Sequence, residues 1–452
     1  MGNKKEKKNT SNEGNKTDNL RAPQKWIAHS WFPLSYFVLL VGIGLMVFFG
    51  PLFWITIVFN IILIYLACFF LISYTEFEKE KKQEIKKWPF LSILIPAWNR
   101  GDSLRVCLQH VLAMEYPGKK EIYVIDDGST DHTQQILNEF KGKFNVITNK
   151  KNKGKAQSLN DTLKIAKGEI VAIIDGDSYP QKDALLQMVP HMIHDQKLGA
   201  VTTVVRVQNS NGILQKIQEL EYFLSFGLHN NVLSSHDGVY VTPGPFSLYL
   251  KKALEETGGY DTHNITEDME ITFHLHVLGY RIKVEPNARV YTDVPETLQG
   301  LWKQRKRWSY GSWQTMFKYR NKLFSKEKSF FWFFYPQRIL LEGSSIIFLF
   351  MILRMVADTI ASFGQTFYSV STIGFEYVAM PAWVIGSSTV LYSFLIALWF
   401  ILIALGIKLS GSRVRKLSIP GLAIFMGVYG IFIISVQAYS LARVVIGSKQ
   451  AW

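Results

Sequence analysis

The sequence predicts an α/β domain, with a mainly parallel sheet covered by helices on both faces, inserted between transmembrane α-helices. Nearly half of the chain, 48%, is hydrophobic, and most of this excess lies in five apolar runs. Each run reaches the length of about twenty residues that crosses a bilayer. The stretch between the second and third runs is long enough for one soluble domain. Within it, Val- and Ile-rich runs alternate with segments of helical spacing, which is typical of a buried parallel sheet.

The five apolar runs determine the expected membrane topology. They cover residues 31–50, 52–74, 330–355, 382–407 and 419–442. Gly50 and Pro51 separate the first two runs, so we expect a two-helix hairpin there. With the chain start inside, the hairpin returns the chain to the cytoplasm before the α/β domain. The last three runs then cross out, in and out again.

The charge of the chain, +14 from 50 basic and 36 acidic residues, agrees with this topology. Clusters of lysine and arginine lie at 4–25, 79–87 and 408–416, each beside an apolar run. Cytoplasmic flanks of membrane segments carry such clusters, and anionic lipid headgroups attract them. No nucleic-acid motif accompanies the charge, so we expect membrane lipids and not nucleic acid as partners. Cys68 and Cys107 are too few for a disulfide framework or a zinc site.

The α/β domain is expected to build its sheet from five short strands. Strands are predicted at 90–95, 121–126, 145–148, 170–174 and 200–205, and helices at 103–114, 130–140, 156–166, 182–194, 269–278 and 298–317. Parallel sheets of this kind bind ligands at the carboxyl ends of their strands. Two acidic motifs of this sequence fall at such ends.

The first acidic motif, Asp126 and Asp127, follows a buried strand and precedes Gly128 and Ser129. The turn would present the carboxylates to the crevice, where they could hold a nucleobase or a ribose, and Gly128 allows close backbone approach. An ordinary helix N-cap at Ser129 or Thr130 explains the same residues equally well.

The second acidic motif, Asp175-Gly176-Asp177, follows the strand at 170–174. Two acids in this spacing suit Mg²⁺ or Mn²⁺, which prefer oxygen ligands and often bind substrate phosphates. A polar turn before Pro180 is the alternative. Lys155, in a basic and glycine-containing turn, could reach a phosphate or simply face solvent; the turn lacks the P-loop pattern.

Two further motifs lie towards the end of the domain. Thr266-Glu267-Asp268 begins a predicted helix, where acids are common for electrostatic reasons, or where Asp268 could take a proton from an acceptor hydroxyl. The amphipathic helix at 298–317 mixes Trp with basic residues and could lie in the membrane interface. Alternatively, Gln304, Arg307 and Trp308 face the crevice, with Arg307 on diphosphate oxygens and Trp308 against a sugar ring.

Taken together and in this order, the motifs resemble those of the membrane-integrated family 2 glycosyltransferases. These include the cellulose, hyaluronan, chitin-oligosaccharide and poly-N-acetylglucosamine synthases, and ceramide glucosyltransferase. The likeness covers about 89–313, and it rests on Pro96-Ala97-Trp98-Asn99, Asp126-Asp127, Asp175-Gly176-Asp177, Thr266-Glu267-Asp268 and Gln304-x-x-Arg307-Trp308. The resemblance implies a GT-A fold and an inverting, single-displacement transfer from a nucleotide sugar, usually UDP-linked.

The resemblance also implies a role for each motif residue. Asp127 or Asp126 would contact the uridine, with Pro96 and Asn99 nearby in the donor site, and Asp175 would contact the nucleotide. Asp177, with Asp175, would hold Mg²⁺ or Mn²⁺, and Lys155 would contact the diphosphate. The catalytic acids would be Asp268, as general base, and Glu267. The acceptor and diphosphate site would be lined by Gln304, Arg307 and Trp308.

The expected organisation is a basic disordered tail at 1–30, a transmembrane hairpin at 31–75, a cytoplasmic GT-A catalytic domain at 89–296, an interface helix at 297–325 and three transmembrane helices at 330–447. We expect a multi-pass enzyme of the cell membrane that extends a β-linked polysaccharide, with a UDP-sugar donor, a saccharide or lipid acceptor and an accessory membrane subunit as candidate partners. A single transfer to a lipid acceptor is the alternative, and a transporter with a nucleotide-binding domain a remote one. The segment 242–247, with Pro243 and Pro245, departs from the family pattern and leaves the acceptor and processivity open.

Overall fold

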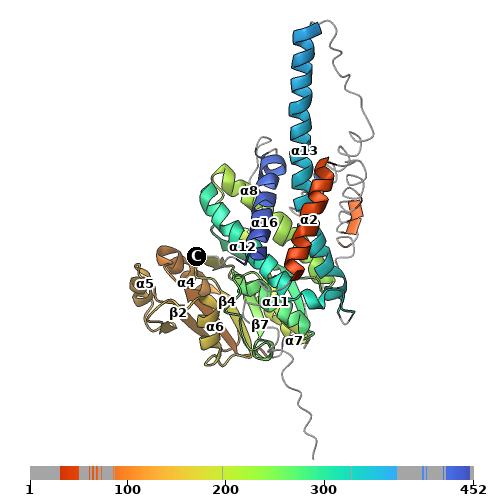
Figure 1. Ribbon diagram of the computed structural model, residues 1–452. Coiled ribbons are helices and arrows are strands. Elements are labelled where there is room, and N and C mark those ends of the chain that lie inside the picture. The colour runs from red at the N-terminus through yellow and green to blue at the C-terminus, as the bar shows by residue number, and fades with distance from the viewer. Residues whose placement is uncertain are drawn as a thin grey trace, which may run out of the picture.

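The computed structural model describes residues 31–49, 87–195, 197–326, 328–373 and 424–447, with isolated positions at 61–85 and 400–421. Figure 1 shows an α/β domain with a group of long helices beside it. The predicted tail at 1–30, the basic cluster at 408–416 and most of the predicted spans at 52–74 and 382–407 lie outside the described residues.

The domain is built on an eight-stranded sheet in the order β3-β2-β1-β4-β7-β6-β8-β5. The strands are β1 Leu91–Ala97, β2 Lys120–Asp126, β3 Asn145–Thr148, β4 Ile170–Ile174, β5 Ser178–Pro180, β6 Leu198–Val207, β7 Phe246–Leu250 and β8 Arg281–Thr292. The pairs β3-β2, β2-β1 and β1-β4 are parallel, as expected. β7 runs antiparallel to both β4 and β6, and β5 antiparallel to β8, so the whole sheet is mixed.

Helices cover both faces of the sheet. Successive side chains of a buried strand point to opposite faces, so one strand contributes to two cores. Leu91, Ile93 and Ile95 of β1 pack into one core with the helices α4 and α7, and Leu94 packs into the other with α6, α11 and α12. The helices that follow the parallel strands are α4 Gly101–Ala113, α5 Thr133–Glu139, α6 Lys155–Leu163 and α7 Ala184–His194. Each lies within three residues of its predicted bounds.

Four further helical segments complete the domain. After β6 the chain forms α8 Ile213–Tyr222, a π-helical turn η2 Phe223–His229 and α9 Asn230–Ser235, and after β7 it forms α10 Lys251–Glu256. The sequence analysis did not predict these segments. Next come α11 Glu267–Val277 and α12 Leu298–Lys318, both close to the predicted bounds.

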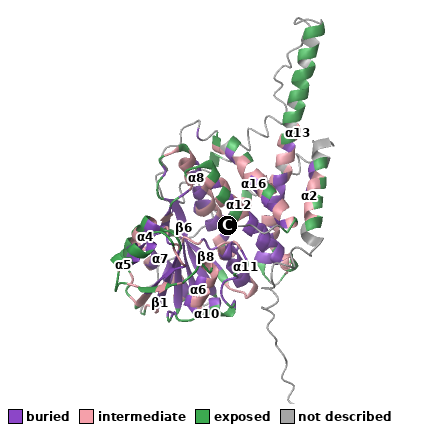
Figure 2. Ribbon diagram, turned by 60° about the vertical axis from the view of Figure 1, so that its left-hand side comes forward, coloured by how far each residue is buried: buried purple, intermediate pink, exposed green. Residues whose placement is uncertain are grey.

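The group of long helices contains α2 Trp31–Phe49, α13 Tyr335–Ile373 and α16 Gly430–Val445, which the π-helical turn η6 Phe425–Tyr429 precedes. α2 packs on α13, and α16 packs on α12 and α13. By length and composition, Phe330–Gln365 and Gly427–Val445 could each cross a membrane, and Leu34–Leu45 is apolar but shorter. The far part of α13 extends beyond the predicted run at 330–355 and exposes apolar side chains such as Ile360 and Phe363 (Figure 2).

Candidate functional site

The carboxyl ends of β1, β2 and β4 meet at one edge of the sheet. β1 lies between β2 and β4, and the parallel register places Ala97 beside Asp126 and Leu94 beside Ile173. The motifs that follow these strands therefore converge, although almost eighty residues separate Ala97 from Asp175. This convergence is the geometry that the acidic motifs predicted.

Asp126 and Asp127 have different environments. Asp127 accepts four hydrogen bonds: Asn149 Nδ2 and Ser158 Oγ donate at 2.8 Å, the backbone of Lys153 at 3.0 Å and that of Gly154 at 2.8 Å. It thus holds the segment 149–158 against the strand end. Asp126 Oδ1 accepts from the Ser129 backbone at 2.9 Å, but Asp126 Oδ2 has no hydrogen-bond partner among the described residues. Asp126 therefore keeps one acceptor that the fold itself does not use.

Asn99 joins the first loop of the site to the turn after β2. Its Oδ1 accepts from the Thr130 backbone at 2.8 Å, and its own N–H donates to Ser129 Oγ at 3.0 Å. Its φ of 49° lies in the left-handed region, which asparagine tolerates better than most residues. Pro96 lies within β1, beside Ile125, and its carbonyl oxygen approaches Gly176. Asn99 and Pro96 thus shape the backbone around the two acidic motifs.

Lys155 connects the metal-type motif with the acidic pair of α11. Its Nζ lies 2.5 Å from Asp175 Oδ1 and 2.8 Å from Glu267 Oε1. Burial alone would lower the pKa of Lys155, but the carboxylates of Asp175, Glu267 and Asp268 raise it well above the ordinary value. The lysine therefore stays charged and holds two anionic motifs together that would otherwise repel each other.

Asp268 has the properties of a general base. Burial and the charge of Glu267 raise its pKa to about 6, and the charges of Lys155 and Arg307 limit the rise. The Gly244 backbone donates to Asp268 Oδ2 at 3.3 Å. A carboxyl group with this pKa is largely ionised at neutral pH yet basic enough to accept a proton.

The segment 242–247, which departs from the family pattern, packs directly on the acidic cluster. A Cβ at Gly244 would lie 2.6 Å from Asp175 Oδ2 and 2.9 Å from Lys155 Nζ, so a side chain at this position would displace the ends of these two side chains. Thr242 Oγ1 donates to the Asp268 carbonyl at 3.2 Å. Thr266 occupies the expected N-cap position of α11, but its hydroxyl donates to Asn264 Oδ1 and makes no capping bond to the described helix.

Asp177 pairs with an arginine that the sequence analysis did not consider. Arg100 Nη1 lies 2.9 Å from Asp177 Oδ2, and both side chains are partly exposed. Burial raises the pKa of Asp177, and the guanidinium opposes the rise. Among the described residues, no group of three or more metal-ligating side chains comes together. The carboxylates of Asp175 and Asp177 fit Mg²⁺ or Mn²⁺, because Asp177 already binds a cationic group, the guanidinium of Arg100. These metal ions commonly complete their coordination shell with waters and phosphate oxygens.

One residue of the α12 motif, Arg307, acts on the acidic cluster. Thr297 Oγ1 caps the helix by accepting from the Gly300 backbone at 3.1 Å. The charge of Arg307 lowers the pKa of Asp268, so the two side chains lie near each other. Trp308 is half-buried, and its ring centroid lies 6.4 Å from that of Tyr222. The negative charge of Asp177 contributes to the raised pKa of Tyr222. Arg307 thus joins Asp175, Lys155 and Asp268 in one neighbourhood.

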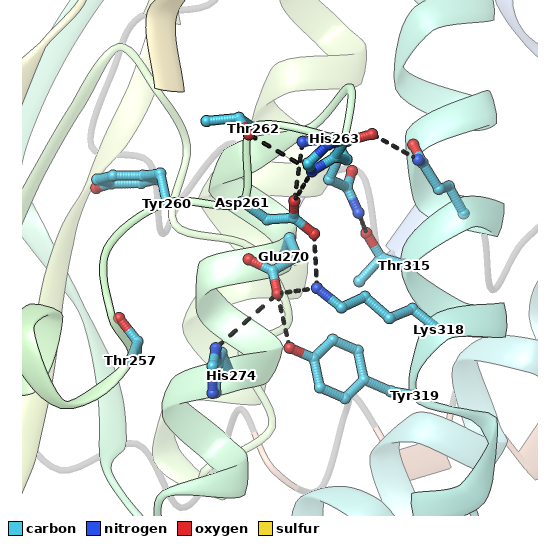
Figure 3. Close-up of polar contacts among 12 residues, drawn as sticks. Thr257, Tyr260, Asp261, Thr262, His263, Glu270, His274, Thr315, Lys318 and Tyr319 are labelled. Atoms are coloured by element: carbon cyan, nitrogen blue, oxygen red, sulfur yellow. Dashed lines mark hydrogen bonds and ion pairs between the residues drawn. The ribbon is translucent and has the colours of Figure 1, made fainter. Parts of the chain in front are cut away.

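A buried polar cluster joins α11 to α12 (Figure 3). The sequence analysis did not predict it. Lys318 Nζ donates to Asp261 Oδ2 at 2.6 Å and to Glu270 Oε1 at 2.7 Å, and the Tyr319 hydroxyl donates to Glu270 Oε1 at 2.7 Å. Glu270 is fully buried and Lys318 nearly so. Because breaking such a pair leaves a buried charge without a partner, the cluster fixes the two helices relative to each other.

Comparisons with known proteins agree with this geometry. Residues 89–311 match the family described as "Glycosyltransferase like family 2". The chain is 32% identical over 339 residues to the poly-beta-1,6-N-acetyl-D-glucosamine synthase of Staphylococcus epidermidis, covering 72% of this chain and 82% of that one. The synthase of the same name from Staphylococcus aureus (strain MSSA476) is 37% identical over 253 residues, 54% of this chain and 61% of its own length.

A solved structure shares the fold. The mannosyltransferase PcManGT from Pyrobaculum calidifontis, in complex with GDP-Man and Mn²⁺, superimposes with a TM-score of 0.56 at 17% identity. The superposition covers 92% of this chain and 99% of the other. At this identity the likeness concerns the arrangement of the chain and not the substrate.

Proposed function

The chain belongs to glycosyltransferase family 2, and on that basis we propose that this GT-A enzyme transfers N-acetylglucosamine from UDP-N-acetylglucosamine to a growing β-linked polysaccharide at a membrane. The observation that carries the proposal is the placement of Asp268 beside Lys155 and Arg307. A base next to two cations is what an inverting transfer needs, because a proton leaves the acceptor while charge develops on the diphosphate.

In the proposed reaction, the acceptor hydroxyl oxygen attacks C1 of the sugar from the face opposite the diphosphate. The new glycosidic bond forms as the bond between C1 and the diphosphate oxygen breaks, and Asp268 takes the hydroxyl proton. Lys155 and Arg307 bind the diphosphate oxygens as their charge grows. Mg²⁺ or Mn²⁺, held by Asp177 with Asp175, would neutralise further negative charge on the leaving group.

For the nucleoside, the proposal favours Asp126 over Asp127 as the direct contact. Asp126 Oδ2 is the acceptor left without a partner among the described residues, whereas four internal donors occupy Asp127. Asp127 would then act by holding the segment that carries Lys155. Asn99 and Pro96 would shape the same pocket through the backbone contacts described above.

On the acceptor side, we propose that Trp308 offers its ring to a sugar, with Gln304 beside it, and that α12 lies along the membrane interface. α2, α13 and α16 would belong to a multi-pass membrane region at 31–75 and 330–447, with the catalytic domain at 89–296 in the cytoplasm. Two helices of suitable length and composition support membrane embedding. An accessory membrane subunit would dock on this region.

A single transfer to a lipid acceptor remains the second candidate, because the segment 242–247 leaves the acceptor and processivity open. The backbone of Gly244 closes directly over Asp175 and Lys155, and two prolines stiffen its approach. The transporter hypothesis gains no support, because Arg354 pairs with Asp358 at 2.9 Å and Arg338 with Glu342, each one helical turn apart.

The test uses membranes that contain the full-length protein and radiolabelled UDP-N-acetylglucosamine, UDP-glucose or UDP-glucuronate, with Mg²⁺ or Mn²⁺. We expect metal-dependent UDP release with the first donor and a ladder of products. One discrete lipid-soluble product would favour the second candidate.

Asp268→Asn should lower UDP release by at least about 100-fold, since an amide cannot take the proton. Asp102→Asn, at an exposed carboxylate of α4, is the matched control. Unchanged UDP release in Asp268→Asn would refute the role of the base.

A further inference from the structure

Arg305 lies inside the motif of α12 but points to a different environment from Arg307. Only 4% of Arg305 is exposed, whereas Arg307 is exposed. Nη1 of Arg305 donates to Gln304 Oε1 at 2.5 Å, and its Cζ lies 4.2 Å from the ring centroid of Trp308. A planar guanidinium can stack on an indole and donate hydrogen bonds in its own plane at the same time. One buried side chain thus contacts both residues proposed for the acceptor site.

The same guanidinium is anchored from outside α12. Arg305 Nη2 lies 2.5 Å from Glu221 Oε2, on α8. The hydroxyl of Tyr429 donates to that same oxygen at 2.6 Å. Tyr429 ends η6, which continues directly into α16, the apolar helix near the end of the chain. A contact path therefore runs from α16 through Tyr429, Glu221 and Arg305 to Trp308.

The electrostatics of this path make it sensitive to small shifts. Burial alone would lower the pKa of Arg305, but Glu221 raises it, so the guanidinium is charged and depends on that carboxylate. Because Glu221 Oε2 serves two donors, a displacement of Tyr429 changes the partner on which Arg305 relies. A buried cation that loses part of its anion shifts towards other partners, and those within reach include Gln304 and the rings of Trp308 and Tyr222.

We propose that Arg305 is a positioning residue for the acceptor and that, with Glu221 and Tyr429, it couples the C-terminal apolar helix to the acceptor end of the site. The proposal rests on the proposed function, since it assumes that Gln304 and Trp308 bind the acceptor. The proposed coupling lies outside the donor site. Among the described residues, no contact joins Arg305, Glu221 or Tyr429 to the donor-site residues Asp126, Asp175 and Lys155.

The most informative variant is Tyr429→Phe, which removes one hydroxyl and keeps the ring contacts with Phe425 and Phe432. We expect the KM for a β-linked N-acetylglucosamine oligosaccharide acceptor to rise about five- to tenfold, the size of effect expected for the loss of one ordinary hydrogen bond. The KM for UDP-N-acetylglucosamine should stay within about twofold, and products should be shorter.

The matched control is Tyr439→Phe, the same substitution on α16. Tyr439 contacts Trp302 through its ring, and no hydrogen bond of its hydroxyl occurs among the described residues. It should behave as wild type. Glu221→Gln and Arg305→Lys should reproduce the acceptor effect, because lysine keeps the charge but loses the planar stacking. Thermal unfolding midpoints close to wild type would separate this effect from a loss of folding.

The outcomes are distinguishable. Acceptor kinetics and product lengths of Tyr429→Phe that match wild type, or an equal change in the KM values for donor and acceptor, would overturn the coupling. Full acceptor affinity in Arg305→Lys would overturn the role of the stacked guanidinium. If wild-type membranes transfer no N-acetylglucosamine at all, the proposed function itself fails, and this is seen before any variant is measured.

Discussion

At the scale of single residues, a small number of cationic side chains neutralises a larger number of carboxylates in the site, and this balance sets the pKa of the carboxylates. Lys155 bridges Asp175 and Glu267, and together with Arg307 it limits the rise in the pKa of Asp268. The convergence of Asp126-Asp127 with Asp175-Gly176-Asp177 was predictable from the sequence, because acids that follow neighbouring parallel strands meet at one sheet edge. Arg100 was not, because its partner, Asp177, is distant in sequence.

The pH dependence of turnover tests the environment of Asp268. The base must be ionised to accept a proton, and its pKa of about 6 lies above the ordinary value for aspartate. The ratio kcat/KM for the donor should therefore be flat above pH 7 and fall about tenfold per pH unit well below 6. Initial rates of UDP release between pH 4.5 and 8.5 measure this profile. An acid limb centred near 4 would show that Asp268 has an ordinary pKa or is not the base.

The Arg100–Asp177 pair predicts competition between a guanidinium and a metal ion. Arg100→Gln removes the competitor, so Mn²⁺ should bind about two- to fivefold more tightly in the absence of nucleotide, the range expected for a half-exposed ion pair. Free Mn²⁺ measured by electron paramagnetic resonance during a titration gives the affinity. Arg105→Gln is the control, since Arg105 pairs with Asp102 and Glu139. Weaker Mn²⁺ binding in Arg100→Gln would contradict the prediction.

At the scale of elements, β1 to β4 and β6 were predictable, whereas β5, β7 and β8 were not. The strands at 90–95, 121–126 and 170–174 are mostly apolar runs, whereas β7 directly follows Pro243 and Pro245. β8 contains Pro286, an unusual residue inside a strand, and alternates polar with buried residues. The crossing of α11 and α12 was equally hidden, since Lys318 finds its partners, Asp261 and Glu270, about fifty residues earlier.

Gly311 of α12 lies close to Thr266, the residue that precedes α11. A Cβ there would lie 2.3 Å from Thr266 Oγ1, next to the acidic pair of α11. Gly311→Ala should therefore lower the free energy of unfolding by about 1–3 kcal/mol, through overpacking, and reduce kcat. Thermal unfolding of the purified protein and UDP release measure both effects. Gly430→Ala, where a Cβ meets no described atom within 4 Å, should leave both nearly unchanged. Equal behaviour of the two variants would show that the crossing is not tight.

At the scale of the whole molecule, α12 is the element that joins the catalytic domain to the long helices. It packs on α11 on the domain side and on α16 on the other (Figure 1). The apolar surface of the far part of α13 has no cover among the described residues, which is the arrangement that a lipid environment favours. Sequence runs of apolar residues predicted these helices, but not which of them would contact the motif of α12.

Membrane fractionation tests how the protein is held. If the helices span the bilayer, both 1 M salt and alkaline carbonate should leave the protein in the membrane pellet, because burial in hydrocarbon is insensitive to screening. Immunoblots of pellet and supernatant give the result. Release by salt alone would mean that basic flanks and the interface helix hold the protein by charge.

The four hydrogen bonds to Asp127 have a consequence for engineering donor choice. A designer who wishes to change the nucleotide would naturally alter the tandem acids after β2. Replacing Asp127 would release the segment 149–158 and so displace Lys155, which belongs to the leaving-group side. Selectivity and turnover would then change together, and library screens scored only by product yield would attribute the loss to the wrong subsite.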